Sequence, residues 1–297
     1  MKKHFKEVKG SIKLLDIEET FDIYFSRFFG LFFAKGAARL GLTPTNVTVA
    51  SLIVGVIGGG LLFFQDSLQI VVIASAFITL AGILDSADGQ LARLTGTASD
   101  FGRMVDGTVD SLVFAACYFG SGFYFIDTYT FIGINVLGWS CGYFHSVKSA
   151  VYEFYKTEYL EFFSHRTNSA IPLKGNQVEP QGSKFYQKVI YHIIKDYTSK
   201  QLFFTSRTPD QRIKMRALAL DENTREEFKN NYRKLNRPML SWWAIFCGIN
   251  THRFAMIGFS LFGRFDLYLF ASLAWTLAMI PLSLAQSRRD KKLLDAF

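Results

Sequence analysis

Four aspartates lie within two apolar stretches of the sequence, and no other residues in it are better placed to do chemistry. Asp85 and Asp88 fall in the first stretch, and Asp106 and Asp110 fall in the second. An ionised carboxylate in hydrocarbon costs about 2.5–3.5 kcal/mol on insertion scales. Four carboxylates in two neighbouring stretches therefore indicate a compensating cation.

Helical spacing places these carboxylates on shared faces. The first pair is three residues apart and the second pair is four residues apart, so each pair occupies one face of a helix. Two adjacent antiparallel helices could turn these faces toward one another, and the resulting carboxylate oxygens are the ligands that Mg²⁺ or Mn²⁺ prefers. A pair of such ions can clamp a diphosphate during phosphoryl transfer. Gly89 and Gly102 leave room for a nucleotide beside the helices, and Arg93 could contact phosphate.

Two other interpretations of the aspartates stay open on this evidence. The first pairs them structurally with Arg93 and Arg103, the nearest arginines. The second is a divalent-cation transporter, because ion pathways also use intramembrane acids. A transporter would have polar residues distributed through the membrane depth of several spans. These aspartates instead cluster at one end of two apolar stretches.

The sequence around the aspartates resembles the signature of the CDP-alcohol phosphotransferase family. Over residues 85–110 it reads D-x-x-D-G-x-x-A-R, eight residues, then G-x-x-x-D-x-x-x-D, without a departure. The resemblance implies a six-helix membrane enzyme, often a homodimer, whose active site opens to the cytoplasmic leaflet. It also implies a reaction in which an acceptor hydroxyl attacks the phosphorus of a CDP-linked donor and releases CMP.

The resemblance further assigns roles to individual residues. Asp85, Asp88 and Asp106 would bind two Mg²⁺ or Mn²⁺ ions, and Asp110 would lie close to them. Asp110 would also act as the general base that takes the proton of the acceptor hydroxyl. The CDP moiety would contact three signature residues, which are Gly89, Arg93 and Gly102.

Arg253 lies within an apolar stretch, next to His252. An arginine inside a membrane span is costly unless it pairs or faces a cavity. Arg253, together with His252, is therefore expected to bind an anionic group of the substrate. The alternative is that Arg253 pairs with an active-site aspartate or with Asp266.

Four further residues are candidates for substrate contact. Arg103 follows the signature glycine, and His145 and Lys148 end another apolar stretch. The alternative for these last two is that they extend to the membrane interface. Asn46 either reaches a phosphate of the donor or caps a helix.

The elements that must position these residues are apolar stretches of about 20 residues, the length that crosses a bilayer. Thr43 and Pro44 predict the start of the first, with Thr43 as the N-cap. Gly58, Gly59 and Gly60 would let neighbouring helices approach closely. We expect an all-α polytopic integral membrane protein with six transmembrane helices, at residues 46–64, 68–92, 104–126, 129–147, 239–262 and 265–285.

The remaining segments are polar or amphipathic. Residues 1–42 predict an N-terminal cytoplasmic and interfacial amphipathic segment, with an interfacial helix at about residues 21–41. Residues 43–150 hold the first four spans with the signature. Residues 151–238 contain 16 lysines and arginines against 10 aspartates and glutamates, which predicts a basic cytoplasmic helical insert. Residues 239–297 hold the last two spans and a basic tail. Lysine and arginine positions predict cytoplasmic termini, in the inner membrane if the source is bacterial.

Composition agrees with a membrane protein. Hydrophobic residues make up 49% of the 297 residues, and the net charge of +8 suits membrane orientation and anionic lipids. No nucleic-acid motif is present, and the three cysteines fall in apolar stretches without the spacing of metal ligands.

The family that the sequence resembles contains enzymes that use CDP-diacylglycerol, and we expect this donor. Several basic residues near a carboxylate-rich site suit a polar, anionic acceptor. The expected acceptor is of the inositol, inositol phosphate or glycerol phosphate kind. The alternative within the family is transfer of a small phospho-alcohol from a CDP-alcohol to a lipid hydroxyl of diacylglycerol or a ceramide-like lipid.

Overall fold

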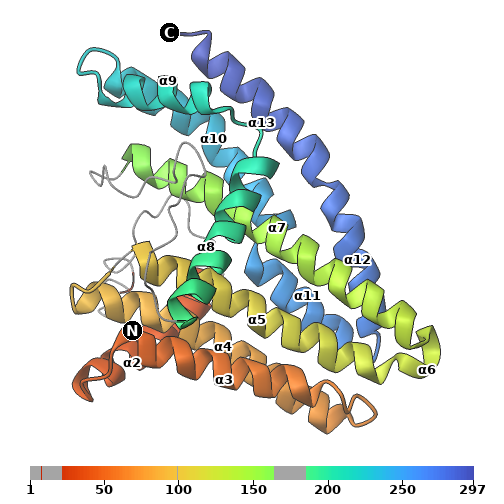
Figure 1. Cartoon of the computed structure of the whole chain (residues 1–297). Coiled ribbons are helices and arrows are strands. Elements are labelled where there is room, and N and C mark those ends of the chain that lie inside the picture. The colour runs from red at the N-terminus through yellow and green to blue at the C-terminus, as the bar shows by residue number, and fades with distance from the viewer. Residues whose placement is uncertain (1–7, 9–21, 99, 164–184) are drawn as a thin grey trace. The chain divides into compact units, whose positions relative to one another are not determined.

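The computed structural model describes Val8 and residues 22–98, 100–163 and 185–297, and the residues in these ranges are predominantly helical, with no β-strand (Figure 1). They form two compact units. The first comprises Met1–His145 and Asn250–Ala274, and the second comprises Ser146–Ile249 and Trp275–Phe297. The expected all-α architecture is therefore confirmed, whereas residues 164–184 of the expected insert lie outside the described residues.

The first unit contains the signature. Its elements are a π-helical turn, η2 (Asp22–Ser26), and the helices α2 (Arg27–Arg39), α3 (Pro44–Leu61), α4 (Leu68–Leu94), α5 (Asp100–Tyr124), α6 (Ile126–Tyr129), the first part of α7 (Phe131–Phe163), α11 (Ile249–Leu261) and most of α12 (Phe265–Leu277). The second unit holds the remainder of α7 with α8 (Phe185–Phe204), α9 (Pro209–Leu220), α10 (Arg225–Cys247) and α13 (Met279–Leu294).

Helix α3 begins where the sequence predicts. The Thr43 side chain accepts a hydrogen bond from the backbone N–H of Asn46, and the Asn46 side chain accepts one from the backbone N–H of Thr43 at 2.9 Å. Pro44 occupies the first helical turn, where its missing N–H costs nothing. Of the two expected roles for Asn46, the structure therefore bears out the helix cap.

Glycines bring α3 close to its two neighbours. A Cβ on Gly58 would lie 3.0 Å from side-chain atoms of α4, and one on Gly59 would lie 2.7 Å from the backbone of α5. Gly120 makes the reciprocal contact, since its Cβ would lie 2.1 Å from the Gly59 carbonyl oxygen. The expected close approach is confirmed at Gly58 and Gly59. At Gly60 a Cβ would meet nothing within 4 Å, although its Cα would lie 3.6 Å from a Cβ on Gly120.

Three helical stretches are long and apolar enough to cross a membrane, among the residues that the structure describes. They are Pro44–Leu61, Leu68–Leu94 and Phe265–Leu294, and they correspond to the first, second and sixth expected spans. Together with the other apolar helices they give a polytopic membrane protein. The total of six spans stays a prediction.

The expected fifth span, residues 239–262, is not one continuous helix. Gly248 adopts an extended backbone with ψ of 139°, which ends α10 before α11 begins at Ile249. A Cβ on Gly248 would lie 2.2 Å from the Ala244 carbonyl oxygen, so a larger residue would not fit this turn. We expected one span because apolar residues dominate 239–262 as a whole, although four polar residues, Asn250 to Arg253, follow the break after Ile249.

Helix α2 packs on the signature helix α4. Its small residues Gly30, Ala34 and Ala37 are buried, and a Cβ on Gly30 would lie 2.9 Å from the Gln90 side chain. Gln90, within the signature, donates a hydrogen bond to the Arg27 carbonyl oxygen at 3.0 Å. Phenylalanines on the opposite side are exposed, with 56% of Phe32 accessible. The interfacial position of this helix stays a prediction.

The second unit is organised around a buried ionic cluster. Arg207 donates hydrogen bonds to both oxygens of Asp290, at 2.8 and 2.9 Å, and to Glu158 at 2.7 Å. The remaining carboxylate oxygen of Glu158 accepts from Arg212. Burial lowers the pKa of Arg207, but Asp290, Tyr232 and Glu158 outweigh it and raise that pKa well above its ordinary value. Arg207 therefore stays charged inside this unit.

Candidate active site

Asp88 lies buried on α4, where α3 supplies a partner. Only 2% of its surface is exposed, and its Oδ2 accepts a hydrogen bond from the Thr48 hydroxyl at 2.6 Å. Thr48 is one helical turn after Pro44, so the cap that starts α3 also sets the position of this hydroxyl. Sequence reasoning missed Thr48, because a threonine in an apolar stretch carries no signal of its own.

Asp110 lies on α5 and forms an ion pair with Arg253 of α11. Arg253 Nη2 lies 3.2 Å from Asp110 Oδ1, and the two residues are 5% and 8% exposed. The structure thus bears out the expectation that Arg253 pairs with an active-site aspartate. Asp266, the other expected partner, pairs instead with Arg264 at 3.0 Å and accepts a hydrogen bond from Tyr129 at 2.7 Å.

The Arg253 guanidinium also lies directly against α4. A Cβ on Gly82 would lie 2.1 Å from Arg253 Nη1 and 2.6 Å from Cζ, so only glycine leaves space for the group at this position. Arg253 therefore bridges the two signature helices, since it contacts Gly82 on one and Asp110 on the other. Gly82 precedes the signature and was not singled out in the sequence.

The two buried carboxylates Asp88 and Asp110 interact as like charges, and Arg93 lies near enough to Asp88 to attract it. The Arg93 guanidinium folds over the signature glycine, because a Cβ on Gly89 would lie 3.5 Å from Arg93 Nη1. The helical face at Gly89 is consequently shared by a carboxylate and a guanidinium, groups that suit a bound cation and a phosphate respectively.

Three expected site residues, Gly102, Arg103 and Asp106, lie in the first turns of α5, but their side chains are outside the described part of the chain. Among the residues whose side chains are described, no group of three or more metal-ligating side chains is close enough to hold an ion. The donor type nevertheless fits Mg²⁺ or Mn²⁺, because Asp85, Asp88 and Asp110 offer carboxylate oxygens on the two signature helices.

His145 and His252 belong to a buried hydrogen-bonded row. His145 Nδ1 lies 3.2 Å from the Tyr118 hydroxyl, and His252 Nδ1 lies 3.1 Å from the Tyr268 hydroxyl. The two hydroxyls are 3.2 Å apart, and the imidazole rings meet edge to face at 5.1 Å. The expectation that His145 extends to the membrane interface is wrong, since packing against Phe114 leaves it 3% exposed.

Lys148 also fails to extend to the interface. Its side chain is fully buried, and its charge acts on Cys247 within the second unit. Substrate contact by Lys148, His145 and His252 stays a prediction.

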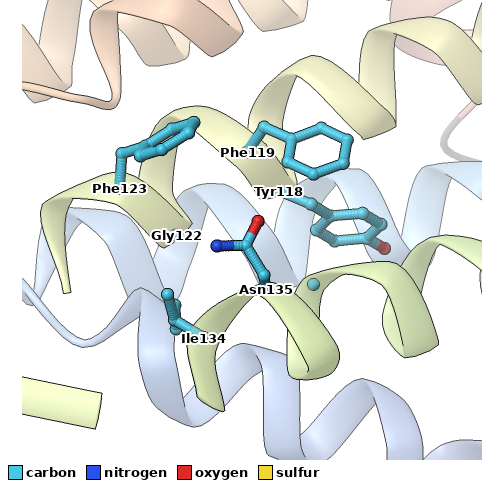
Figure 2. A pocket seen from close by; sticks show the side chains of 7 residues that line it. Tyr118, Phe119, Gly122, Phe123, Ile134 and Asn135 are labelled. Atoms are coloured by element: carbon cyan, nitrogen blue, oxygen red, sulfur yellow. The ribbon is translucent and has the colours of Figure 1, made fainter. Parts of the chain in front are cut away.

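A pocket between α5 and α7 lies away from the aspartates. Figure 2 shows its lining side chains, which come from Tyr118, Phe119, Gly122, Phe123, Ile134, Asn135 and Gly138. The α5 members follow Asp110 by 8 to 13 residues, which is about 12–20 Å along a helix. The pocket is mainly apolar and does not include the signature carboxylates.

The part of the chain that holds the signature is similar to known proteins. Residues 41–152 match the family model described as CDP-alcohol phosphatidyltransferase. The chain is 34% identical over 86 residues to a Pyrococcus horikoshii protein named archaetidylinositol phosphate synthase, and 39% identical over 87 residues to a Mycolicibacterium smegmatis protein named phosphatidylinositol phosphate synthase.

Each of these matches covers 29% of this chain, and they cover 44% and 38% of the two relatives, so less than half of either relative is aligned. The family match includes α3, α4, α5 and the complete signature with the buried Asp88 and Asp110. Residues 41–152 of this chain, which include the complete signature, are thus similar to the CDP-alcohol phosphatidyltransferase family.

Proposed function

We propose that the chain transfers a phosphatidyl group from CDP-diacylglycerol to the hydroxyl of an inositol phosphate acceptor and releases CMP. The observation that carries the proposal is the pair of buried signature carboxylates, Asp88 and Asp110, held by Thr48 and Arg253 on adjoining helices. Buried carboxylates held this firmly are costly to maintain unless the site uses them.

The relatives support the acceptor more strongly than the donor. The names of both relatives contain an inositol phosphate head group, whereas the lipid parts differ, being archaetidyl in one and phosphatidyl in the other. An inositol phosphate acceptor is anionic, which agrees with the basic residues expected around the site. The alternative acceptors within the proposal are inositol and glycerol phosphate.

The chain's own residues would divide the work as follows. Asp110 accepts the proton of the acceptor hydroxyl as its oxygen attacks the donor phosphorus, and Arg253 fixes the orientation of the Asp110 carboxylate. Thr48 fixes Asp88 in the same way. Arg93 and the backbone at Gly89 face the nucleotide phosphates.

The site would hold two Mg²⁺ or Mn²⁺ ions through Asp85, Asp88, Asp106 and Asp110. When bound, the ions supply positive charge that neutralises the diphosphate and stabilises the CMP leaving group. We further propose that the protein works as a homodimer in a cellular membrane, with this site at the cytoplasmic leaflet.

The test is CMP release by the purified protein from CDP-diacylglycerol with Mg²⁺ or Mn²⁺, with inositol phosphate, inositol and glycerol phosphate added one at a time. We expect release that depends on inositol phosphate and stops when a chelator removes the metal. Mn²⁺ binding, followed by equilibrium dialysis, should weaken in Asp88→Asn.

Asp110→Asn should lower kcat by at least about 100-fold, because the amide retains the hydrogen bond from Arg253 but cannot take a proton. Asp127→Asn is the matched control, since Asp127 is exposed on α6, and it should keep full activity. Wild-type activity of Asp110→Asn would contradict the assignment of Asp110 as the general base.

Two other outcomes would change the proposal itself. CMP release only with a small CDP-alcohol and a lipid hydroxyl would overturn the proposed donor, and metal uptake without any CMP release would favour the transporter.

A further inference from the structure

The Asp110–Arg253 pair is the inner end of a longer chain of polar contacts in the first unit. Arg253 Nη1 donates to Asn250 Oδ1 at 3.2 Å, and Asn250 Nδ2 donates to Asp22 Oδ1 at 3.1 Å. Asp22 lies in the turn before α2, and Asn250 lies in the first turn of α11. The chain of contacts therefore connects the N-terminal helical segment to the signature aspartate.

The middle of this chain needs an amide. A guanidinium can only donate hydrogen bonds and an ionised carboxylate can only accept them. Asn250 satisfies both neighbours because it presents its oxygen to Arg253 and its NH₂ group to Asp22. An aspartate at position 250 would keep the contact with Arg253 but would face Asp22 with a like charge.

The position of Arg253 is also limited on its other side. Gly82 leaves just enough space for the guanidinium, so Arg253 cannot move toward α4. Asn250 fixes Nη1, which leaves Nη2 directed at Asp110 Oδ1. The orientation of the Asp110 carboxylate thus depends on a contact made two residues farther out, at Asp22.

We propose that Asn250 and Asp22 are positioning residues that hold Arg253 on Asp110 and so set the geometry of the proposed general base. This inference rests on the proposed function. Neither residue is required to touch a substrate. Their loss should therefore lower kcat and leave the KM of donor and acceptor unchanged, because a small displacement of a reacting group slows the chemical step without weakening binding.

The experiment measures kcat and both KM values for CMP release with a set of variants in the full chain. Asn250→Ala and Asp22→Ala should each lower kcat by about 10- to 100-fold. Asp22→Asn should stay near the wild-type rate, since its amide oxygen still accepts from Asn250. Asn250→Asp should be as slow as Asn250→Ala. Asn135→Ala is the matched control, because that side chain donates to the Phe131 carbonyl of its own helix, and it should leave kcat unchanged.

A double variant separates positioning from independent effects. If Asp22 acts only through Asn250, the Asn250→Ala, Asp22→Ala double variant should be no slower than Asn250→Ala alone. Three outcomes would overturn the inference while the proposed function stands. They are a double variant whose loss of kcat is the product of the two single losses, a wild-type kcat in Asn250→Ala, and a change confined to the KM of one substrate.

Absence of CMP release from the wild-type protein would instead overturn the proposed function. Thermal unfolding of the same variants then tests whether the contacts from Asp22 through Asn250 to Arg253 exist. The proposed contacts require that the decreases in Tm of the two single variants do not add in the double variant, and additive decreases would overturn them.

Discussion

At the scale of single residues, the site is held by side chains whose partners lie far away in the sequence. Thr48 and Asp88 are 40 residues apart, and Asp110 and Arg253 are 143 apart. Residue types and spacing predicted the aspartates, since four carboxylates at helical intervals in apolar stretches need a common explanation. They did not predict Thr48 or Gly82, because the role of each depends on which helix packs beside it.

The absence of a side chain at Gly82 leads to a prediction about the position of Arg253 and the rate of transfer. Gly82→Ala should push the Arg253 guanidinium away from Asp110, since the new methyl group would lie 2.1 Å from Nη1. The arginine side chain can bend, so we expect a small change in Tm and a decrease in kcat of about tenfold or more. Gly138→Ala is the control, because a Cβ there meets nothing within 4 Å. Equal kcat values for the two variants would contradict the role of Gly82.

At the scale of elements, helices α4 and α5 are positioned by their common neighbour α3. The sequence predicted the start of α3 from Thr43 and Pro44 and the position of α4 from its apolar length. It failed at Gly248, because apolar residues dominate 239–262 as a whole while the helix breaks just before the polar residues Asn250 to Arg253. Hydropathy reports burial or lipid contact, and it does not report whether a helix is continuous.

The contact between α3 and α5 can be tested with two adjacent glycines. Gly59→Leu should separate the helices, because even a Cβ would lie 2.7 Å from the α5 backbone, and it should lower the free energy of unfolding by about 1–3 kcal/mol or more. Gly60→Leu, one position along, faces open space and should be neutral or stabilising. Unfolding in detergent, monitored by circular dichroism, measures both. Equal losses would show that α3 does not approach α5 through this face.

At the scale of the whole molecule, the two units are stabilised differently. The first relies on close helix contacts and a few polar pairs, whereas the second contains a buried network of charges centred on Arg207. The basic composition of residues 151–238 predicted a helical insert, and α8, α9 and the first part of α10 are helices within it. The composition did not predict that the charge at Arg207 is buried, because burial depends on acidic partners from α7 and α13.

Removing the central charge should destabilise the second unit strongly. Arg207→Met leaves Glu158 and Asp290 buried without it, which costs about 3–5 kcal/mol. We expect a large decrease in Tm and faster proteolysis within residues 185–249. Exposed Arg288→Met should have little effect. Adding Asp290→Leu to Arg207→Met should recover part of the loss, since one stranded charge is gone, and a further decrease would contradict this account.

The distance along the chain between Arg207 and Asp290 also bears on synthesis. Their positions differ by 83 residues. Ribosomes add about 5–20 residues per second, so roughly 4–17 s pass between the two residues. During that interval the newly made arginine has no Asp290 to meet, and the second unit cannot close. Because Asp290 lies on α13, the nascent second unit must stay protected until α13 has been translated.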